Sequence, residues 1–146
     1  MNTKKNSVSV LQVNFDDRKL INKIFEIRNQ VFVVEQNVDP SEEYEFEESS
    51  IHFLLFEDKT PCATARYRKT EKGIKLERFA VLKQYRKKGY GNKILKRILE
   101  VLKHTKDDIY LHAQVQVVDF YKKQGFIENG DIFSEAGIQH YKMIYN

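Results

Sequence analysis

The segment Leu76–Lys103, LERFAVLKQYRKKGYGNKILKRILEVLK, contains the pattern that decides the fold. An apolar, strand-like run stops at Leu82, and an amphipathic helical pattern begins at Gly91. A basic loop with two glycines joins them. A strand that passes through glycines into a helix leaves several backbone N–H groups without internal partners, and the helix dipole adds partial positive charge there. We therefore expect the loop to bind an anion.

The composition of this loop favours a pyrophosphate group as the anion. Gly89 and Gly91 let the backbone approach a phosphate closely. Three further residues of the loop, Arg86, Lys87 and Lys88, each carry a full positive charge. The Walker A pattern G-x-x-x-x-G-K-[ST] is absent, and Ile94 occupies the position of the third glycine of a dinucleotide-binding G-x-G-x-x-G motif. These absences argue against a nucleotide triphosphatase or a Rossmann enzyme.

The whole chain has the size and composition of one compact domain. Its 146 residues are 41% hydrophobic and 12% aromatic, which predicts a single domain over residues 1–146. The N-terminal MNTKKNSVSV has no apolar segment behind its basic residues, and no run of about 20 apolar residues occurs, so we expect a cytoplasmic protein without a membrane partner. The single cysteine, Cys62, excludes an internal disulfide and favours a buried thiol.

The order of periodic segments predicts an α+β (mixed α/β) fold with a central mixed sheet. A strand over Val8–Val13, with a slip at Leu11, precedes a helix from about Arg18 to Val33. The later segments are strands over 51–57, 62–70 and 74–82, a helix after Gly91, a strand in DIYLHAQV, a short helix in VVDFYKKQ ended by Gly125, and two strands around SEAG. The predicted order is β-α-β-β-β-α-β-α-β-β.

The net charge of +4 conceals a strong asymmetry along the chain. From Asn29 to Asp58 there are many Asp and Glu residues and no Lys or Arg, whereas the segment from Arg78 to Leu99 is basic and contains no acid. Such an arrangement predicts two ligands, or two parts of one site, of opposite charge.

Several motifs together resemble the GNAT superfamily of N-acetyltransferases. RKKGYG matches the acetyl-CoA loop R/Q-x-x-G-x-G/A, and FYKKQGF at 120–126 resembles the late helix whose tyrosine lies near the cofactor sulfur. The sequence is more closely similar to the ElaA/YjcF-type branch, through R..VFVVEQ, LERFAVL, AQ...VDFYKKQGF and F.E.GI.H. The resemblance extends over roughly residues 10 to 145 and implies a largely antiparallel, twisted sheet flanked by helices.

The resemblance implies acetyl-CoA as co-substrate, and the lack of a His/Cys/Asp cluster with metal-ligand spacing predicts no metal. The pyrophosphate would bind backbone amides of the loop from Arg86 to Asn92, and the pantetheine arm would pair with a strand edge at 79–81. Gln114 stands where many GNAT enzymes have an asparagine. The cofactor-binding residues implied in this way are Phe79, Ala80, Val81, Arg86, Lys87, Lys88, Gly89, Tyr90, Gly91, Asn92 and Gln114.

Direct acetyl transfer to a primary amine needs an acid for the departing thiolate and an acceptor for the amine proton. Tyr121 matches the family's acid. Glu77 is the candidate base, because strand alternation would place its side chain on the face of Phe79 and Val81. His112, in the next strand, would relay a proton or pack. Weaker candidates for the acceptor pocket are His52, Arg66, Glu135 and His140.

The acidic segment predicts the kind of acceptor. In this superfamily the corresponding region walls the acceptor site, so Glu35 and the carboxylates after it would attract a small, cationic amine. One alternative is a nucleic-acid-binding domain that uses the basic segment 78–97, which a sequence pI near 9.0 would suit. The other is an acetyl-CoA-binding module without catalysis. We expect no nucleic-acid partner, and edge strands make a homodimer possible.

Overall fold

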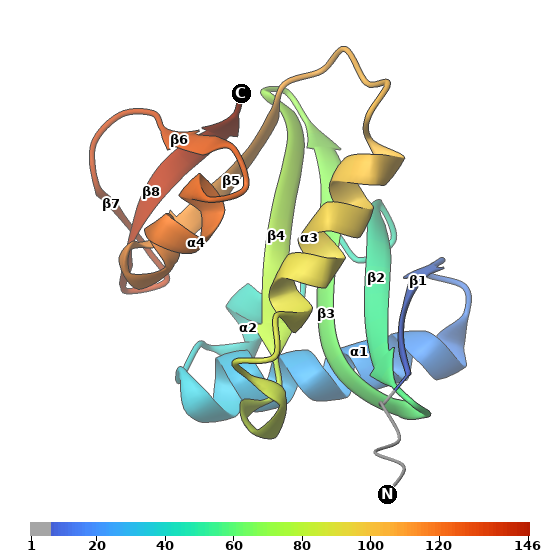
Figure 1. The fold of residues 1–146 in the computed structure, drawn as a ribbon. Coiled ribbons are helices and arrows are strands. Elements are labelled where there is room, and N and C mark those ends of the chain that lie inside the picture. The colour runs from blue at the N-terminus through green and yellow to red at the C-terminus, as the bar shows by residue number, and fades with distance from the viewer. Residues whose placement is uncertain (1–6) are drawn as a thin grey trace, which may run out of the picture.

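Eight strands form one sheet in the computed structural model, which describes residues 7–146 (Figure 1). Their spatial order is β1-β2-β3-β4-β5-β8-β6, and β7 also pairs with β8. All neighbours are antiparallel except β4 and β5. The strands are β1 (Val8–Val13), β2 (Ser50–Glu57), β3 (Thr60–Thr70), β4 (Gly73–Val81), β5 (Ile109–Gln114), β6 (Phe126–Glu128), β7 (Phe133–Glu135) and β8 (Ile138–Tyr145).

Helices cover both faces of this sheet. Figure 1 shows α3 in front of β2, β3 and β4, and α1 behind these strands. The helical segments are α1 (Arg18–Arg28), the π-helix η1 (Asn29–Glu35), α2 (Pro40–Glu43), the 3-10 turn η2 (Lys83–Tyr85), α3 (Tyr90–Val101), the 3-10 turn η3 (Val115–Val117) and α4 (Val118–Lys122). The predicted α+β class and mixed, largely antiparallel sheet are confirmed, and the structure adds the short strand β6.

Side chains that alternate along the central strands pack into two separate hydrophobic cores, one on each face of the sheet. Phe53 and Leu55 of β2 pack in the cluster that contains α3, whereas Leu54 packs with α1. The predicted slip at Leu11 is wrong, because the β1–β2 ladder runs without interruption from Val8 to Val13. Val13 is buried because it faces α1, on the side of the sheet opposite to Val8.

The first helical segment changes its winding where the sequence pattern predicts a continuous helix. The α-helix ends at Arg28, and a π-helix continues to Glu35. The backbone N–H of Gln36 donates to the carbonyl of Val31, an i to i+5 bond of 3.2 Å. This wider turn keeps Val31 buried and brings Glu35 beside the loop that precedes α3.

A bulge in β4 decides which of its side chains share a face. Arg66 of β3 pairs with Glu77, and the next pair joins Thr64 to Ala80, so β4 contains an additional residue between the two pairs. Arg78 occupies the bulge with φ of 59°.

The bulge corrects one prediction about the site. Glu77 lies on the α1 face, where Ala80 also packs, while Phe79 and Val81 lie on the face of α3 and α4. The expectation that Glu77 shares a face with Phe79 and Val81 is therefore wrong, because simple alternation fails across a bulge.

The parallel strands β4 and β5 separate soon after they pair. Their ladder joins 74 to 109 and ends where Leu76 pairs with Leu111. Both strands continue, to Val81 and Gln114, without pairing to each other. The sheet therefore contains an opening between two of its central strands.

A buried ion-pair network holds the acidic segment against the α1 face. Arg28 is 1% exposed, its Nε lies 2.7 Å from Glu43 Oε1, and its Nη1 lies 2.7 Å from Glu47 Oε2. Arg66 is equally buried; its Nη1 lies 2.6 Å from Glu47 Oε1, and it also pairs with Glu77. The two arginines join the segment after η1 to the helix and the sheet.

Replacing Arg28 with Met is expected to destabilise the protein strongly. The substitution leaves Glu43, which is 3% exposed, without its nearest cationic partner. Breaking a buried pair in this way costs about 3 to 5 kcal/mol. Urea unfolding should show this loss, whereas Lys19→Met on the exposed face of α1 should change stability by less than about 0.5 kcal/mol. Equal stability of the two variants would contradict a stabilising role for the network.

Candidate active site

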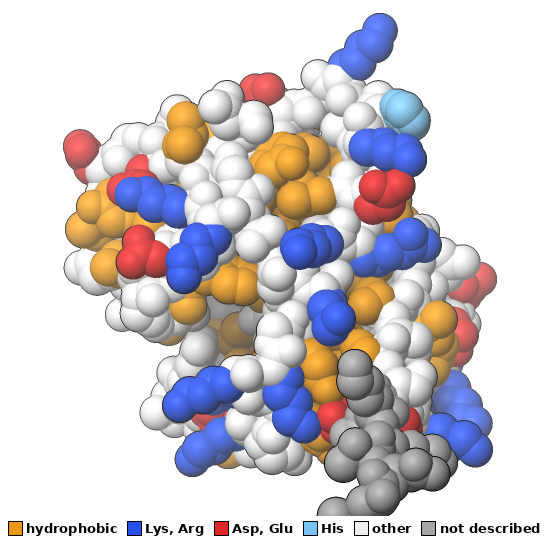
Figure 2. Space-filling view, in the orientation of Figure 1, with side chains coloured by type: hydrophobic (Ala, Val, Ile, Leu, Met, Phe, Trp, Pro, Cys, Tyr) orange, Lys and Arg blue, Asp and Glu red, His pale blue; other side chains and the backbone are white. Residues whose placement is uncertain are grey.

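A cavity of about 900 Å³ occupies the opening between β4 and β5. Figure 2 shows the surface hollowed beside the loop that precedes α3, with Lys and Arg side chains on its rim. Most predicted site residues line this cavity: Glu77, Phe79, Val81, Arg86, Lys87, Gly89, Tyr90, Gly91, Asn92, His112, Gln114 and Tyr121. Three do not line it, namely Glu35, Ala80 and Lys88.

The two ends of the cavity differ in character because the opening joins the two faces of the sheet. On the α3 and α4 side the walls are mostly apolar, with Phe79, Val81 and Phe120. On the other side the walls carry polar and charged groups, among them Gln36 and Lys75. A ligand that spans the opening would contact an apolar wall on the α3 and α4 side and a polar wall on the opposite side.

The start of α3 presents backbone donors to the cavity. Gly89 precedes the helix with φ of 76°, a left-handed conformation that favours glycine, and no side chain caps the helix. The N–H groups of Tyr90, Gly91 and Asn92 begin the helix and so have no intrahelical acceptor. A Cβ at Gly91 would lie 3.6 Å from Phe120, so the glycine keeps this wall open.

One buried polar atom beside these donors has no protein partner. The side-chain oxygen of Asn92 is buried and accepts no hydrogen bond from any group within residues 7–146. Buried polar atoms are rarely left unpaired. Together with the exposed helix start and the open wall at Gly91, this atom fits a polar ligand that enters the cavity at α3.

The basic side chains of the loop are largely engaged by carboxylates. Arg86 Nη2 lies 2.8 Å from Glu35 Oε1, and Arg86 Nε donates to the carbonyl of Val81 at 2.9 Å. Lys88 Nζ lies 3.0 Å from Glu57 Oε1. The hydroxyl of Tyr90 donates to the same carboxylate at 2.7 Å. Burial of the hydroxyl, together with this hydrogen bond, raises the pKa of Tyr90 to about 12. Lys88 and Tyr90 thus hold the loop to β2 through their side chains.

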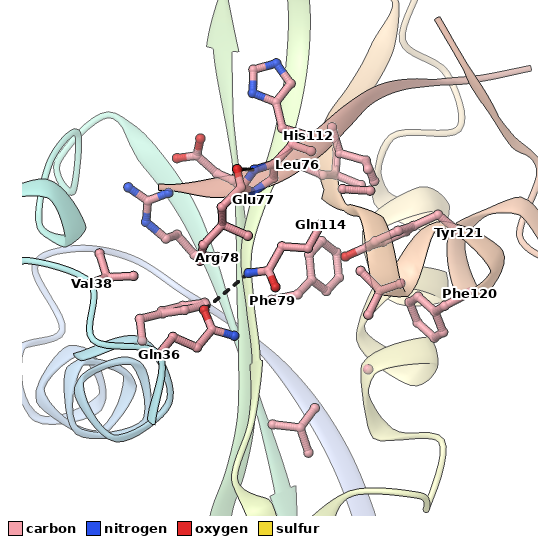
Figure 3. A pocket seen from close by; sticks show the side chains of 18 of the residues that line it. Gln36, Val38, Leu76, Glu77, Arg78, Phe79, His112, Gln114, Phe120 and Tyr121 are labelled. Carbon is pink, nitrogen blue, oxygen red and sulfur yellow. Dashed lines mark hydrogen bonds between the residues drawn. The ribbon is translucent and has the colours of Figure 1, made fainter. Parts of the chain in front are cut away.

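Tyr121 projects from α4 into the apolar side of the cavity (Figure 3). Its ring packs edge-on against Phe79, Phe120 and Phe126, at centroid distances of 5.7, 4.9 and 5.9 Å. Burial raises the pKa of the phenol far above its ordinary value of 10. Its hydroxyl has no hydrogen-bond partner among residues 7–146. At neutral pH it is a protonated donor, available to a ligand.

Glu77 is held ionised by surrounding cations and is therefore a poor proton acceptor. Arg66 pairs with its carboxylate, and Arg68 Nε and Lys75 Nζ lie 3.1 and 3.3 Å from it. Burial alone would raise the pKa, but the charge of Arg66, with smaller effects of other cations, lowers it to about 2. Arg78, next in the bulge, lies 3.2 Å from Glu43 Oε2.

Two glutamines bridge the polar end of the cavity. Gln114 Nε2 donates to Gln36 Oε1 at 3.2 Å, as Figure 3 shows, and Gln114 Oε1 accepts from Gln116 Nε2 at 2.6 Å. Sequence reasoning placed a polar role at Gln114 and missed Gln36. The signal was present, since Gln36 is the last residue of the VFVVEQ motif. The predicted Glu35, one residue earlier, pairs with Arg86 instead.

The weaker candidates separate into two places. His52 and Arg66 lie in the buried network on the α1 face and do not line the cavity. The Nε2 of His52 donates to the carbonyl of Glu47 at 3.0 Å, and burial lowers its pKa. Glu135 and His140 line the polar end of the cavity.

Comparison with known proteins assigns the family. A profile described as "Acetyltransferase (GNAT) domain" matches residues 14–146. The chain belongs to the GNAT acetyltransferase family. YjcF of Bacillus subtilis, described as an uncharacterized N-acetyltransferase, is 37% identical over 123 residues, which cover 82% of this chain and 88% of YjcF. The resemblance to GNAT enzymes of the ElaA/YjcF-type branch is confirmed, and the protein is a GNAT-type N-acetyltransferase.

Solved GNAT structures share this fold. The crystal structure of Escherichia coli ElaA has a TM-score of 0.85 at 24% identity and covers 94% of this chain and 99% of ElaA. Arabidopsis thaliana Naa50, in complex with the bisubstrate analogue CoA-Ac-MVNAL, has a TM-score of 0.72 at 24% identity and covers 96% of this GNAT chain and 99% of Naa50.

No helix within residues 7–146 is long and apolar enough to cross a membrane. Among the same residues, no group of three His, Cys, Asp or Glu side chains is placed to hold a metal ion.

Glu77 is expected to make stability fall in acid. Its pKa in the folded protein, about 2, lies below the ordinary 4.5, so the unfolded chain binds this proton more readily. The stabilisation is complete above about pH 5 and is lost as the pH falls through about 2, with a total of about 3 kcal/mol. In urea titrations, native protein should therefore be more stable than Glu77→Gln at pH 7, and the gap should close by about this amount towards pH 2.

The exposed Glu26 on α1 provides the matched control, because Glu26→Gln removes a carboxylate outside the network. A gap between native protein and Glu77→Gln that stays constant from pH 7 to the acid limit would show that the cations do not hold Glu77 ionised.

Proposed function

We propose that this GNAT protein transfers the acetyl group of acetyl-CoA directly to a primary amine. The observation that carries the proposal is the meeting, in one cavity, of the start of α3, the unpaired edge of β4 and the Tyr121 hydroxyl. These are a site for an anion, a site for an extended polar arm and a proton donor. The bisubstrate complex of the Naa50 structure, which shares the fold, supports the choice of coenzyme A.

Acetyl-CoA would lie along the opening with its pyrophosphate at α3. The free N–H groups at 90–92 and the helix dipole favour an anion there, and Lys87 lines the same wall. The edge of β4 that faces β5 offers backbone groups at Phe79 and Val81 to the pantetheine amides. Arg86 and Lys88, already paired with carboxylates, would support the loop as well as the ligand.

The transfer then needs the protein to place a donor beside the departing sulfur. The amine nitrogen forms a bond to the thioester carbonyl carbon, the carbon–sulfur bond breaks, and the thiolate takes the proton of the Tyr121 hydroxyl. A phenol buried among aromatic rings stays protonated at neutral pH, so it is ready to give this proton.

For the acceptor we propose a small, cationic amine. Glu43 and Glu47 already form ion pairs with arginines. The carboxylates that would attract a cation are therefore the exposed ones of Glu45 and Glu135 at the polar end. A single catalytic domain over residues 1–146, a cytoplasmic location and a homodimer stay predictions. A nucleic-acid role has less support, because Arg86 and Lys88 of the basic segment have carboxylate partners within the chain.

Gly91→Glu is expected to abolish acetyl-CoA binding without unfolding the protein. A glutamate in the first turn of α3 interacts favourably with the helix dipole and so stabilises the helix, but its carboxylate repels the pyrophosphate. Acetyl-CoA at about 100 times its Kd should stabilise native protein by about 2.7 kcal/mol, a thermal shift of several degrees. The variant should show no shift.

Gly91→Gln, of the same shape without charge, is the matched control and should retain more affinity than Gly91→Glu. The anion site at α3 would be refuted by a full acetyl-CoA shift in Gly91→Glu. No shift of the native protein at millimolar acetyl-CoA would refute the proposed function itself.

Tyr121→Phe is expected to lower kcat about a hundredfold, the usual contribution of a general acid. Because the hydroxyl has no partner among residues 7–146, its removal should leave the melting temperature and the Kd for acetyl-CoA unchanged. Release of free thiol from acetyl-CoA would be followed with four primary amines, spermidine, agmatine, tryptamine and L-lysine methyl ester. Tyr145→Phe, at the more exposed end of β8, is the control. A kcat within about threefold of native for Tyr121→Phe would remove the acid role.

A further inference from the structure

A cluster of two histidines and one carboxylate stands at the polar end of the cavity. His112 comes from β5, Glu135 from β7 and His140 from β8, and all three line the cavity. His112 Nδ1 lies 3.2 Å from Glu135 Oε1, and His140 Nε2 lies 3.7 Å from Glu135 Oε2. The acetyl-transfer chemistry described above uses Glu135 only to attract the acceptor and gives the two histidines no role.

The hydrogen bond to Glu135 fixes the proton arrangement of the His112 ring. An ionised carboxylate can only accept, so Nδ1 of His112 carries the hydrogen and Nε2 keeps its lone pair. The bond to His112 lowers the pKa of Glu135, which keeps the carboxylate ionised. This is the arrangement by which a carboxylate orients a histidine base.

Aromatic rings and a backbone carbonyl hold the cluster in place. Phe133 packs edge-on against the His112 ring, with centroids 4.9 Å apart at 77°, and Tyr110 lies 5.9 Å away. His140 Nδ1 donates to the carbonyl of Ile138 at 2.7 Å. The His112 side chain is still 24% exposed, so the ring is oriented but accessible from the cavity.

We infer that His112 Nε2 accepts the proton of the incoming ammonium group and that Glu135 stabilises the imidazolium that forms. The inference rests on the proposed acetyl transfer and names its base. Glu77, the candidate from sequence, is ionised but paired with Arg66, Arg68 and Lys75, which leaves it little tendency to take a proton. His112 has an uncommitted lone pair, an accessible ring and a carboxylate partner, whereas the lone pairs of Glu77 face cations in a buried site.

The charged groups around His112 come from several strands. Glu135 on β7 favours the imidazolium, while His140 and Lys142 on β8 and Lys75 on β4 oppose it when they are charged. Lys75 is paired with Glu77 at 3.3 Å, and Lys142 lies over the Tyr110 ring at 5.2 Å. Glu135 is the one acid in contact with His112 among residues 7–146, so replacing it removes the only acidic partner of the ring among these residues.

The protons balance with one base and one acid. The ammonium group gives a proton to His112, and the neutral amine forms the nitrogen–carbon bond to the thioester. As the carbon–sulfur bond breaks, the thiolate takes the proton of Tyr121, and the proton still surplus on the nitrogen returns to Tyr121 through solvent. His112 releases its proton to solvent after the amide leaves. The net products are the N-acetyl amine, free CoA thiol and one proton.

The test is the pH dependence of kcat/KM from pH 5 to 9.5, with the amine of the four named above that native protein uses best. Native protein should show a rise that levels off above the ionisation of a histidine. In His112→Gln, kcat at pH 7 should fall about a hundredfold, with the KM for acetyl-CoA unchanged. The residual rate should keep rising with pH towards the pKa of the free amine.

Glu135→Gln separates this role from packing. Loss of the carboxylate should move the rise in kcat/KM to lower pH, because the imidazolium loses its partner. His104→Gln, on the exposed segment after α3, is the matched control and should follow the native profile.

Each other outcome overturns a distinct claim. A native pH profile in His112→Gln, or an unshifted rise in Glu135→Gln, would overturn the assignment of the base and leave acetyl transfer standing. If native protein releases no thiol with any of the four amines, the proposed function fails and the inference falls with it.

Discussion

The site depends on how the buried carboxylate of Glu77 is held. Arg66, Arg68 and Lys75 surround it on the α1 face, which fixes Glu77 opposite Arg66 in the ladder between β3 and β4. The additional residue of the bulge, at Arg78, follows at once and turns the rest of β4 over. Phe79 therefore faces α4, at the level where β4 has already parted from β5. An ion pair on one face thus sets the geometry of the wall on the other.

The opening divides the chemistry of the proposed reaction between two environments. On one side, aromatic packing excludes water around Tyr121 and raises its pKa, which suits a donor that must stay protonated until the thiolate appears. On the other side, Glu135 gives His112 a charged partner, which suits a base that must become positive. The apolar side thus favours the neutral, protonated phenol, while the polar side places a carboxylate beside the histidine. A flat, fully paired sheet would offer no such junction.

Local patterns predicted the local parts of this site. The basic glycine loop and α3 follow from residues within one segment, and Tyr121 belongs to a short motif. The sequence therefore indicated these parts, and the structure places the start of α3 and Tyr121 at one cavity. No sequence pattern near Arg78 predicts the bulge. Its position depends on Arg66 of β3, which pairs with Glu77 and is distant in sequence. The π-helical turn before Glu35 is similar, since apolar spacing alone continues through it. Errors therefore concentrated where distant residues decide a side chain's face.

The charge asymmetry of the chain also had a second meaning that only the structure supplies. The acidic segment contains no Lys or Arg, so in sequence it looks like a binding surface. Arg28 lies before it and Arg66 after it, and both fold back to neutralise Glu43 and Glu47. In the folded protein these carboxylates therefore stabilise the wall of the cavity through ion pairs. The attraction left for the proposed amine acceptor comes from fewer groups, so its recognition should depend on the shape of the polar end more than on total charge.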